Sequence, residues 1–219
     1  MKLSNLMLKK TSIKYLQMTK KNNLNYTKTC RDALKIMLSI KDGTHNVEHI
    51  VRVYDWSREL AKNYPEADLK VLKVAAYWHD VGRKYESKKV DNHNVKSGRI
   101  VEKYLQKKHF SNDFINKVKD AAINHSFSFS PTTIEGKILH DADKIAFFPD
   151  HTILDAYDSM EEGYETNSFN RKRLLKALKK YLENKDYLYE GLILKESKEI
   201  YKKIEKDFIN TLKTLVNKE

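Results

Sequence analysis

The stretch AAYWHDVGR, residues 75–83, ends an apolar segment with an adjacent histidine and aspartate. Pro65 precedes that segment, whose Leu, Val, Ala and Trp content predicts a buried helix over residues 66–80. Burying ionisable side chains such as His79 and Asp80 among these residues is costly unless each is paired or binds a metal. This helix end is therefore the first candidate for a functional site.

Two further segments place ionisable side chains in a similar setting. His45 and His49 are four residues apart on a helix predicted over residues 45–63, so both project from one face. Asp141 and Asp143 lie within the apolar string LHDADKIAFF. Helices of one bundle can direct imidazoles and carboxylates to a common point, where they bind cations such as Mn, Fe, Co, Ni or Zn. The three segments together predict a metal site.

The rest of the chain is also typical of helices. Six Gly and three Pro in 219 residues leave few helix breakers. The T-x-x-E spacing at residues 132–135 predicts a capping box that begins one helix. We therefore expect an all-α bundle, and the first 24 residues are expected to form a loosely attached helix or arm. The other helices are predicted over residues 29–40, 93–107, 112–124, 168–183 and 195–217.

The positive charge is concentrated at one end of the chain. The formal net charge is +12, and residues 1–40 carry nine basic and one acidic side chains. Residues 41–150, which hold the candidate site, carry 19 basic and 16 acidic side chains. This small excess favours a phosphorylated substrate. The basic segment has few aromatic residues for stacking on bases, which argues against a nucleic-acid partner.

Cysteine content and hydropathy indicate the cellular compartment. Cys30 is the single cysteine, so neither an internal disulfide nor a cysteine-rich zinc site can form, as is typical of a reducing cytoplasm. No apolar run approaches the ~20 residues of a membrane-spanning helix, and the opening MKLSNLMLKK is not typical of a signal peptide. We predict a cytoplasmic protein without a membrane partner, whose metal ligands are histidines and carboxylates.

The motifs, in their order, resemble the HD-domain superfamily of metal-dependent phosphohydrolases. The signature of that superfamily is a histidine, a histidine–aspartate pair and a distal aspartate on successive helices. The resemblance covers residues 44–148 and lies in HNVEHIVRV (45–53), AAYWHDVGR (75–83), INHSFS (123–128) and EGKILHDADKIA (135–146). The last two strings are similar to small bacterial and archaeal HD hydrolases that act on nucleotides. The resemblance implies an HD-domain helical bundle (41–150), and we expect it to be preceded by a basic N-terminal arm or helix (1–40) and followed by a C-terminal helical extension packed on the core (151–219).

Carried over to this chain, the resemblance implies a metal site formed by His49, His79, Asp80 and Asp143. Asp141 is the competing candidate for the distal ligand, and otherwise orients a ligand or a nearby lysine. His93 and His125 occupy places where some members of the superfamily hold a second metal. The alternative is that these two histidines bind substrate phosphate.

The same resemblance implies a reaction. One or two divalent ions (Mn, Fe, Ni, Co, Zn or Mg) would lower the pKa of a water that attacks phosphorus. His45 resembles the histidine that related phosphodiesterases use as an acid on the leaving oxygen. The cations nearest in sequence to the ligands, which can clamp phosphate, are Arg83, Lys84 and Lys144. We predict a phosphohydrolase whose small phosphorylated substrate is a nucleotide and which cleaves a phosphate ester or anhydride in it.

Two other classes of function stay open at this point. A non-catalytic sensor or scaffold would keep the fold and bind a metal or nucleotide without turnover, although every ligand position is filled here. A nucleic-acid-binding protein would use the basic arm and show steep salt dependence. The C-terminal helices are expected to cover the site, to form a homodimer interface, or both.

Overall fold

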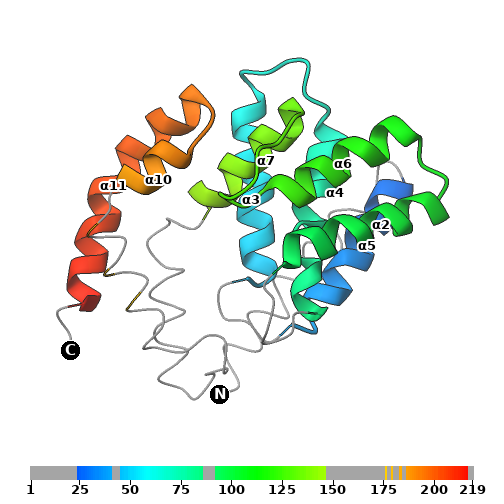
Figure 1. The fold of residues 1–219 in the computed structure, drawn as a ribbon, viewed down its shortest axis with the longest axis horizontal. Coiled ribbons are helices and arrows are strands. Elements are labelled where there is room, and N and C mark those ends of the chain that lie inside the picture. Colours follow the sequence, from blue (N-terminus) through cyan, green and yellow to red (C-terminus); the bar gives the residue numbers. More distant parts are fainter. Residues whose placement is uncertain are drawn as a thin grey trace.

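The computed structural model describes residues 24–40, 45–85, 92–146 and 186–216, together with the single positions 176, 179 and 183. Within these residues the chain forms helices and no strands, which confirms the predicted all-α fold. The elements, shown in Figure 1, are α2 (Leu24–Met37), α3 (Val47–Ala61), α4 (Leu69–Trp78), the short 3-10 helix η1 (Val81–Tyr85), α5 (His93–Lys107), α6 (Asn112–Asn124), α7 (Ile134–Ile145), α10 (Asp186–Gly191) and α11 (Lys195–Val216).

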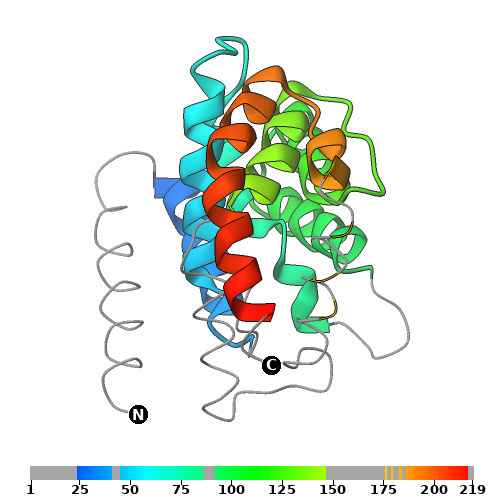
Figure 2. The ribbon, with the colours of Figure 1, turned by 90° about the vertical axis from the view of Figure 1, so that its left-hand side faces the viewer.

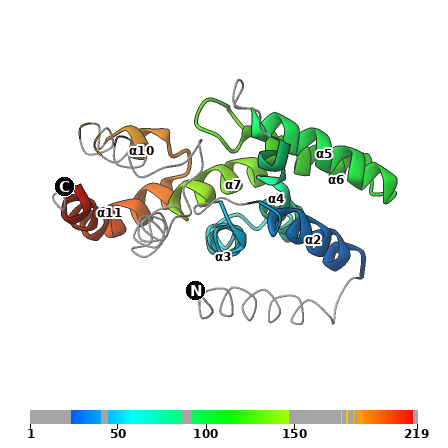
Figure 3. The same ribbon diagram turned by 90° about the horizontal axis from the view of Figure 1, so that it is seen from below.

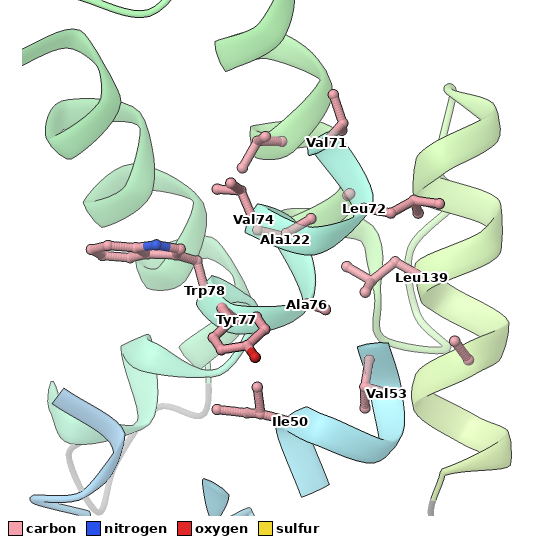
Figure 4. Close-up of a cluster of buried hydrophobic side chains, with 14 of the residues drawn as sticks. Ile50, Val53, Val71, Leu72, Val74, Ala76, Tyr77, Trp78, Ala122 and Leu139 are labelled. Atoms are coloured by element: carbon pink, nitrogen blue, oxygen red, sulfur yellow. The ribbon is translucent and has the colours of Figure 1, made fainter. Parts of the chain in front are cut away.

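Helix α4 lies at the centre of the described bundle, because it is apolar on nearly every side. It packs against α2, α3, α6 and α7. Figure 4 shows its side chains among Ile50 and Val53 of α3, Ala122 of α6 and Leu139 of α7, all of them buried. Trp78, the last residue of α4, donates its indole N–H to the Thr29 carbonyl of α2 at 3.2 Å. The candidate His–Asp pair therefore follows directly on a largely buried helix.

Capping side chains explain where the predicted helix bounds fail. The side chain of Asp68 accepts the Lys70 backbone N–H at 2.7 Å, so α4 begins at Leu69 rather than shortly after Pro65. The Thr133 hydroxyl accepts the Gly136 N–H at 3.0 Å and so begins α7.

The predicted capping box at residues 132–135 is therefore wrong. Thr132 donates its hydroxyl to Asp120 at 2.9 Å instead of capping the helix. Glu135 is buried and its carboxylate accepts the Asp68 backbone N–H at 3.0 Å, which ties the start of α7 to the start of α4.

Helix α2 packs on the folded core. Helix α2 lies within residues 1–40, yet it buries Cys30, Ala33, Leu34 and Met37. Burial raises the pKa of the Cys30 thiol to about 12. Residues 24–37 are thus part of the core, because their apolar stripe covers α4. The arm predicted for the first residues, up to residue 23, and most of the helix predicted over residues 168–183 lie outside the described residues.

Helices α10 and α11 lie beside α7 at one end of the described molecule, and α5 and α6 lie at the other (Figures 1 and 3). Figure 2 shows α11 crossing in front of the core. Leu192, Leu194 and Tyr201 are buried, and Tyr64, which follows α3, donates its hydroxyl to Glu196 of α11 at 2.5 Å. These contacts dock the start of α11 on the core. Among the described helices, none combines the length and the apolar character needed to cross a membrane.

Candidate metal centre

The histidine of the His–Asp pair is oriented by the helix that it ends. His79 is fully buried at the C-terminal end of α4, and its Nδ1 lies 2.8 Å from the Ala76 carbonyl oxygen. A carbonyl oxygen can only accept, so Nδ1 carries the proton and Nε2 keeps its lone pair. His125 repeats this arrangement at the end of α6, where its Nδ1 lies 2.9 Å from the Ala122 carbonyl oxygen. Both imidazoles therefore present a metal-binding nitrogen.

A first set of donors brings together the four ligands predicted from the sequence. Atoms of His49, His79 and Asp80 lie within 4.8 Å of one another. Asp143 Oδ1 lies 3.0 Å from His49 Nε2 and 3.6 Å from His79 Nε2. Asp80 Oδ2 lies 3.5 Å from His79 Nε2. Residues from α3, from the end of α4 and from α7 thus converge on one point.

A second set of donors shares Asp80 with the first. Asp80 Oδ1 lies 3.4 Å from His93 Nε2 and 3.7 Å from His125 Nε2. The two Nε2 atoms lie 3.3 Å apart, and all three residues are buried. The structure thus groups the two extra histidines with the His–Asp pair.

The donors of the first set fit a divalent cation. Within the described part of the chain, His49 Nε2, His79 Nε2 and Asp80 Oδ2 are buried without a hydrogen-bond partner. Each such atom costs about 1–3 kcal/mol when nothing satisfies it. Ligand atoms at ~2.1 Å from one ion lie about 3.0–3.4 Å apart, close to the spacings of 3.0–3.6 Å observed here. A bound cation would satisfy all of these atoms together.

Burial and neighbouring charges keep the donors in their metal-binding states. Burial opposes the charge on Asp143, but the Lys144 ammonium and the His49 imidazole hold the pKa of its carboxyl well below the usual range. Burial lowers the pKa of His49, and burial together with the neighbouring His79 holds the pKa of His125 well below its usual value. These groups are an ionised carboxylate and neutral imidazoles near pH 7.

The pKa values of Asp80 and His79 are shifted by neighbouring groups of opposite charge. Burial alone would raise the pKa of Asp80, yet the Arg83 guanidinium and the neighbouring His79 hold it well below the usual value. Burial alone would lower the pKa of His79, but the carboxylates of Asp80 and Asp143 raise it. Removing those negative charges by metal binding would favour the neutral imidazole.

The other residues predicted to act at the site differ in position. His45 is partly exposed, and its ring centroid lies 5.7 Å from that of His49. Arg83 Nε lies 2.9 Å from Asp80 Oδ1. Lys144 Nζ donates to Asp143 Oδ2 at 2.8 Å and also contacts the His125 carbonyl oxygen.

Lys84 differs from Arg83 and Lys144, the other two residues predicted to bind phosphate, because its side chain is exposed on η1.

Asp141 does not point into the cluster, which corrects its interpretation as a competing ligand. Its oxygens accept the backbone N–H groups of Ile193 at 3.0 and 3.1 Å and of Leu194 at 2.7 Å. His140 Nδ1 lies 2.8 Å from Asp141 Oδ1. Residues 141 and 143 are about 200° apart around a helix of 3.6 residues per turn, so they face opposite sides. Asp141 instead holds the chain that enters α11.

Sequence reasoning missed the residues that support the site. Asn46 accepts the His49 backbone N–H at 3.0 Å and begins α3. Arg52 donates Nε to the Ala146 carbonyl at 3.2 Å, which joins the helix of His49 to the helix of Asp143. Asparagine directly before an apolar helix is a recognisable cap signal. No local pattern marks a contact between residues 94 positions apart, as Arg52 and Ala146 are.

A comparison with protein families finds a match over the same region of the chain. A family model of the HD domain matches residues 46–147. This stretch, slightly under half of the chain, is therefore similar to an HD domain. The match spans α3 to α7 and contains every donor of both sets. A comparison with curated proteins finds no match to the chain.

Solved structures share the fold at low sequence identity. A predicted HD superfamily hydrolase from an uncultured Thermotogales bacterium is 17% identical with a TM-score of 0.61, over 87% of this chain and 91% of its own. Bacillus subtilis YpgQ, solved in complex with ADP, is 17% identical with a TM-score of 0.59, over 86% and 97%. A Lactobacillus plantarum protein is 18% identical with a TM-score of 0.63, over 90% and 98%. These likenesses extend the shared fold beyond the HD domain.

Proposed function

We propose that this protein is a divalent-metal-dependent phosphohydrolase that cleaves a phosphate ester or anhydride in a nucleotide. The observation that carries the proposal is the convergence of buried donor atoms without hydrogen-bond partners, contributed by His49, His79 and Asp80, with Asp143 beside them. These four residues would hold the cation. A divalent cation held there supplies a water of lowered pKa and neutralises phosphoryl oxygens.

The chain's own charges prepare the site for an anionic substrate. The carboxylates of Asp80 and Asp143 are paired with the cations of Arg83 and Lys144. Two negative and two positive side chains leave no net repulsion of a phosphate. The side chains of Asp143, Arg83 and Lys144 are 15%, 16% and 10% exposed, whereas Asp80 is only 1% exposed. The substrate phosphate would therefore approach on the side formed by the first three residues.

His45 is the residue that we propose as the acid on the leaving oxygen. It is partly exposed one turn before His49, so it can face both solvent and the metal-binding donors. An imidazole suits proton transfer near neutral pH. Replacing His45 by Gln should lower kcat by ~100-fold or more and leave the bound metal unchanged. A parallel loss of metal would instead make His45 a ligand.

The nucleotide is supported by one structural neighbour. YpgQ, which shares the fold, was solved with ADP. The two basic side chains at the donors suit the charged phosphates of such a ligand. A non-catalytic protein that binds nucleotide without turnover is the alternative that the test must separate.

The test is a substrate screen with the purified protein. Nucleoside mono-, di- and triphosphates and model phosphoesters are each incubated with Mn²⁺, Co²⁺, Ni²⁺ or Mg²⁺, and released phosphate and pyrophosphate are measured. We expect metal-dependent release from at least one nucleotide. His79→Gln and Asp80→Asn should abolish both the release and the tight binding of metal.

The matched control is His109→Asn, because His109 is exposed and its positive φ of 58° suits asparagine. This variant should behave as the wild type. Tight nucleotide binding without product for any metal would support the sensor instead. Retention of metal by both ligand variants would refute the proposed site.

A further inference from the structure

The two sets of donors differ in what already contacts them. In the first set, the nearby cation Lys144 reaches Asp143 through Oδ2. Asp143 Oδ1, the oxygen that faces His49 and His79, is a different atom. Lys144 therefore does not occupy the oxygen of Asp143 that faces the histidines, and the donor atoms of the first set stay available for an ion.

In the second set, a guanidinium contacts the donor atoms themselves. Arg83 Nε lies 2.9 Å from Asp80 Oδ1, and Arg83 Nη2 lies 3.2 Å from His93 Nε2. These are two of the three atoms that would bind an ion in the set of Asp80, His93 and His125. Arg83 belongs to η1, the short helix that packs against α5, so the local fold holds it at this place.

The arginine determines which atoms donate and which accept in this contact. A guanidinium has only donors, so the Nε2 atom of His93 that faces Arg83 must be the acceptor. The lone pair that would bind an ion is thus directed at Arg83. His125 Nε2 also carries a lone pair, because its Nδ1 bonds to the Ala122 carbonyl. Two such nitrogens 3.3 Å apart, beside a carboxylate, need a positive charge close by.

We propose that Arg83 is the built-in cation of the second set and that it competes with a second metal ion there. The first set then takes one divalent ion tightly, and a second ion binds only when Arg83 leaves its position. The Arg83 side chain is 16% exposed, which gives it a path toward solvent. Arg83 thereby determines how many ions the centre holds. This inference rests on the proposed function only in taking the first set as a metal site.

The test counts Mn²⁺ ions bound to the full chain without any substrate. Equilibrium dialysis at rising Mn²⁺ gives the number and affinity of sites, and electron paramagnetic resonance separates an isolated ion from a spin-coupled pair. The wild type should bind one ion tightly and a second at least ~10-fold more weakly. Arg83→Gln should tighten the second ion by ~10-fold or more and show the coupled signal at lower Mn²⁺. Adding His93→Gln to that variant should remove the second ion and keep the first.

Lys84→Gln is the matched control, because Lys84 is the next residue of η1 and is exposed. It removes the same charge and should bind Mn²⁺ as the wild type does. An unchanged second affinity in Arg83→Gln would overturn the proposal. Two equally tight ions in the wild type would also overturn it, even if the variant does not fold, while leaving the phosphohydrolase proposal intact. Absence of any Mn²⁺ binding would refute the first site and both proposals.

Discussion

Replacing Asp141 by alanine tests whether this aspartate has a structural role, in contrast to Asp143, the proposed metal ligand two residues away. The carboxylate accepts N–H groups from Ile193 and Leu194. Leu194 is 6% exposed, so its N–H would lose its partner in a buried place, at about 1–3 kcal/mol. Ile193 is 42% exposed and can hydrogen-bond to water instead, so its loss adds about 1 kcal/mol. The expected destabilisation is therefore about 2–4 kcal/mol.

The assay combines thermal unfolding with metal titration. For a chain of this size the destabilisation corresponds to a fall in Tm of about 4–16 °C. Protease cleavage near the start of α11 should become faster, because Asp141 holds that segment. Affinity for Mn²⁺ should stay close to the wild-type value in Asp141→Ala. In Asp143→Ala it should fall by ~100-fold or more, because an ionised ligand is lost.

Asp55→Ala is the control for removing an aspartate, because its side chain is 58% exposed on α3. It should change neither Tm nor metal affinity appreciably. If Asp141→Ala loses Mn²⁺ as strongly as Asp143→Ala while its metal-free Tm is unchanged, then the assignment of Asp141 to the α11 contact is wrong.

Three further predictions concern pH, metal and packing. Because the pKa values of His49 and His125 are lowered from 6.5 by burial, the metal-free protein should lose stability in urea unfolding as pH falls below about 6.5. The raised pKa of His79 contributes stability that is constant below pH 6.5 and is lost only as pH rises above it, so it does not oppose this trend. Stability that is flat from pH 6.5 to 5.5 would contradict the prediction. Mn²⁺ at about 100 times its Kd should add ~2.7 kcal/mol to the free energy of unfolding, and EDTA should reverse the gain in a melting experiment; a Tm indifferent to both would argue against the site. Gly98→Ala would place a Cβ 2.3 Å from Ile123 Cγ1 between α5 and α6. The free energy of unfolding should therefore fall by about 1–3 kcal/mol, with a matching decrease in Tm. A wild-type Tm would show that Ile123 moves aside without strain.

Helix positions were predictable where local signals agree. Helices α5 and α6 have the predicted bounds, 93–107 and 112–124, and Ser111 begins α6 by accepting the Phe114 N–H. The start of α4 was not predictable from Pro65 alone. Asp68 caps that helix while its own N–H is held by Glu135, a residue 67 positions away. A distant contact of this kind leaves no local pattern in the sequence.

The candidate metal donors were chosen from the sequence for a related reason. Ionisable residues in apolar helices are costly, so His79, Asp80 and Asp143 stand out from their neighbours in the linear chain. The direction of each side chain was not visible there. Asp141 and Asp143 share one apolar string, yet one holds α11 and the other faces His49. Helical geometry separates them, but only the neighbours of α7 determine which one meets the histidines.

The sequence by itself determined an all-α chain with an HD motif, because apolar periodicity and the order of histidines and aspartates are properties of the linear chain. Tertiary structure alone decided that α2 belongs to the core and that Asp80 is shared by two sets of donors. It also decided that Arg83 contacts the second set. Each of these depends on distances between residues on different helices, and such distances are determined by how the helices pack.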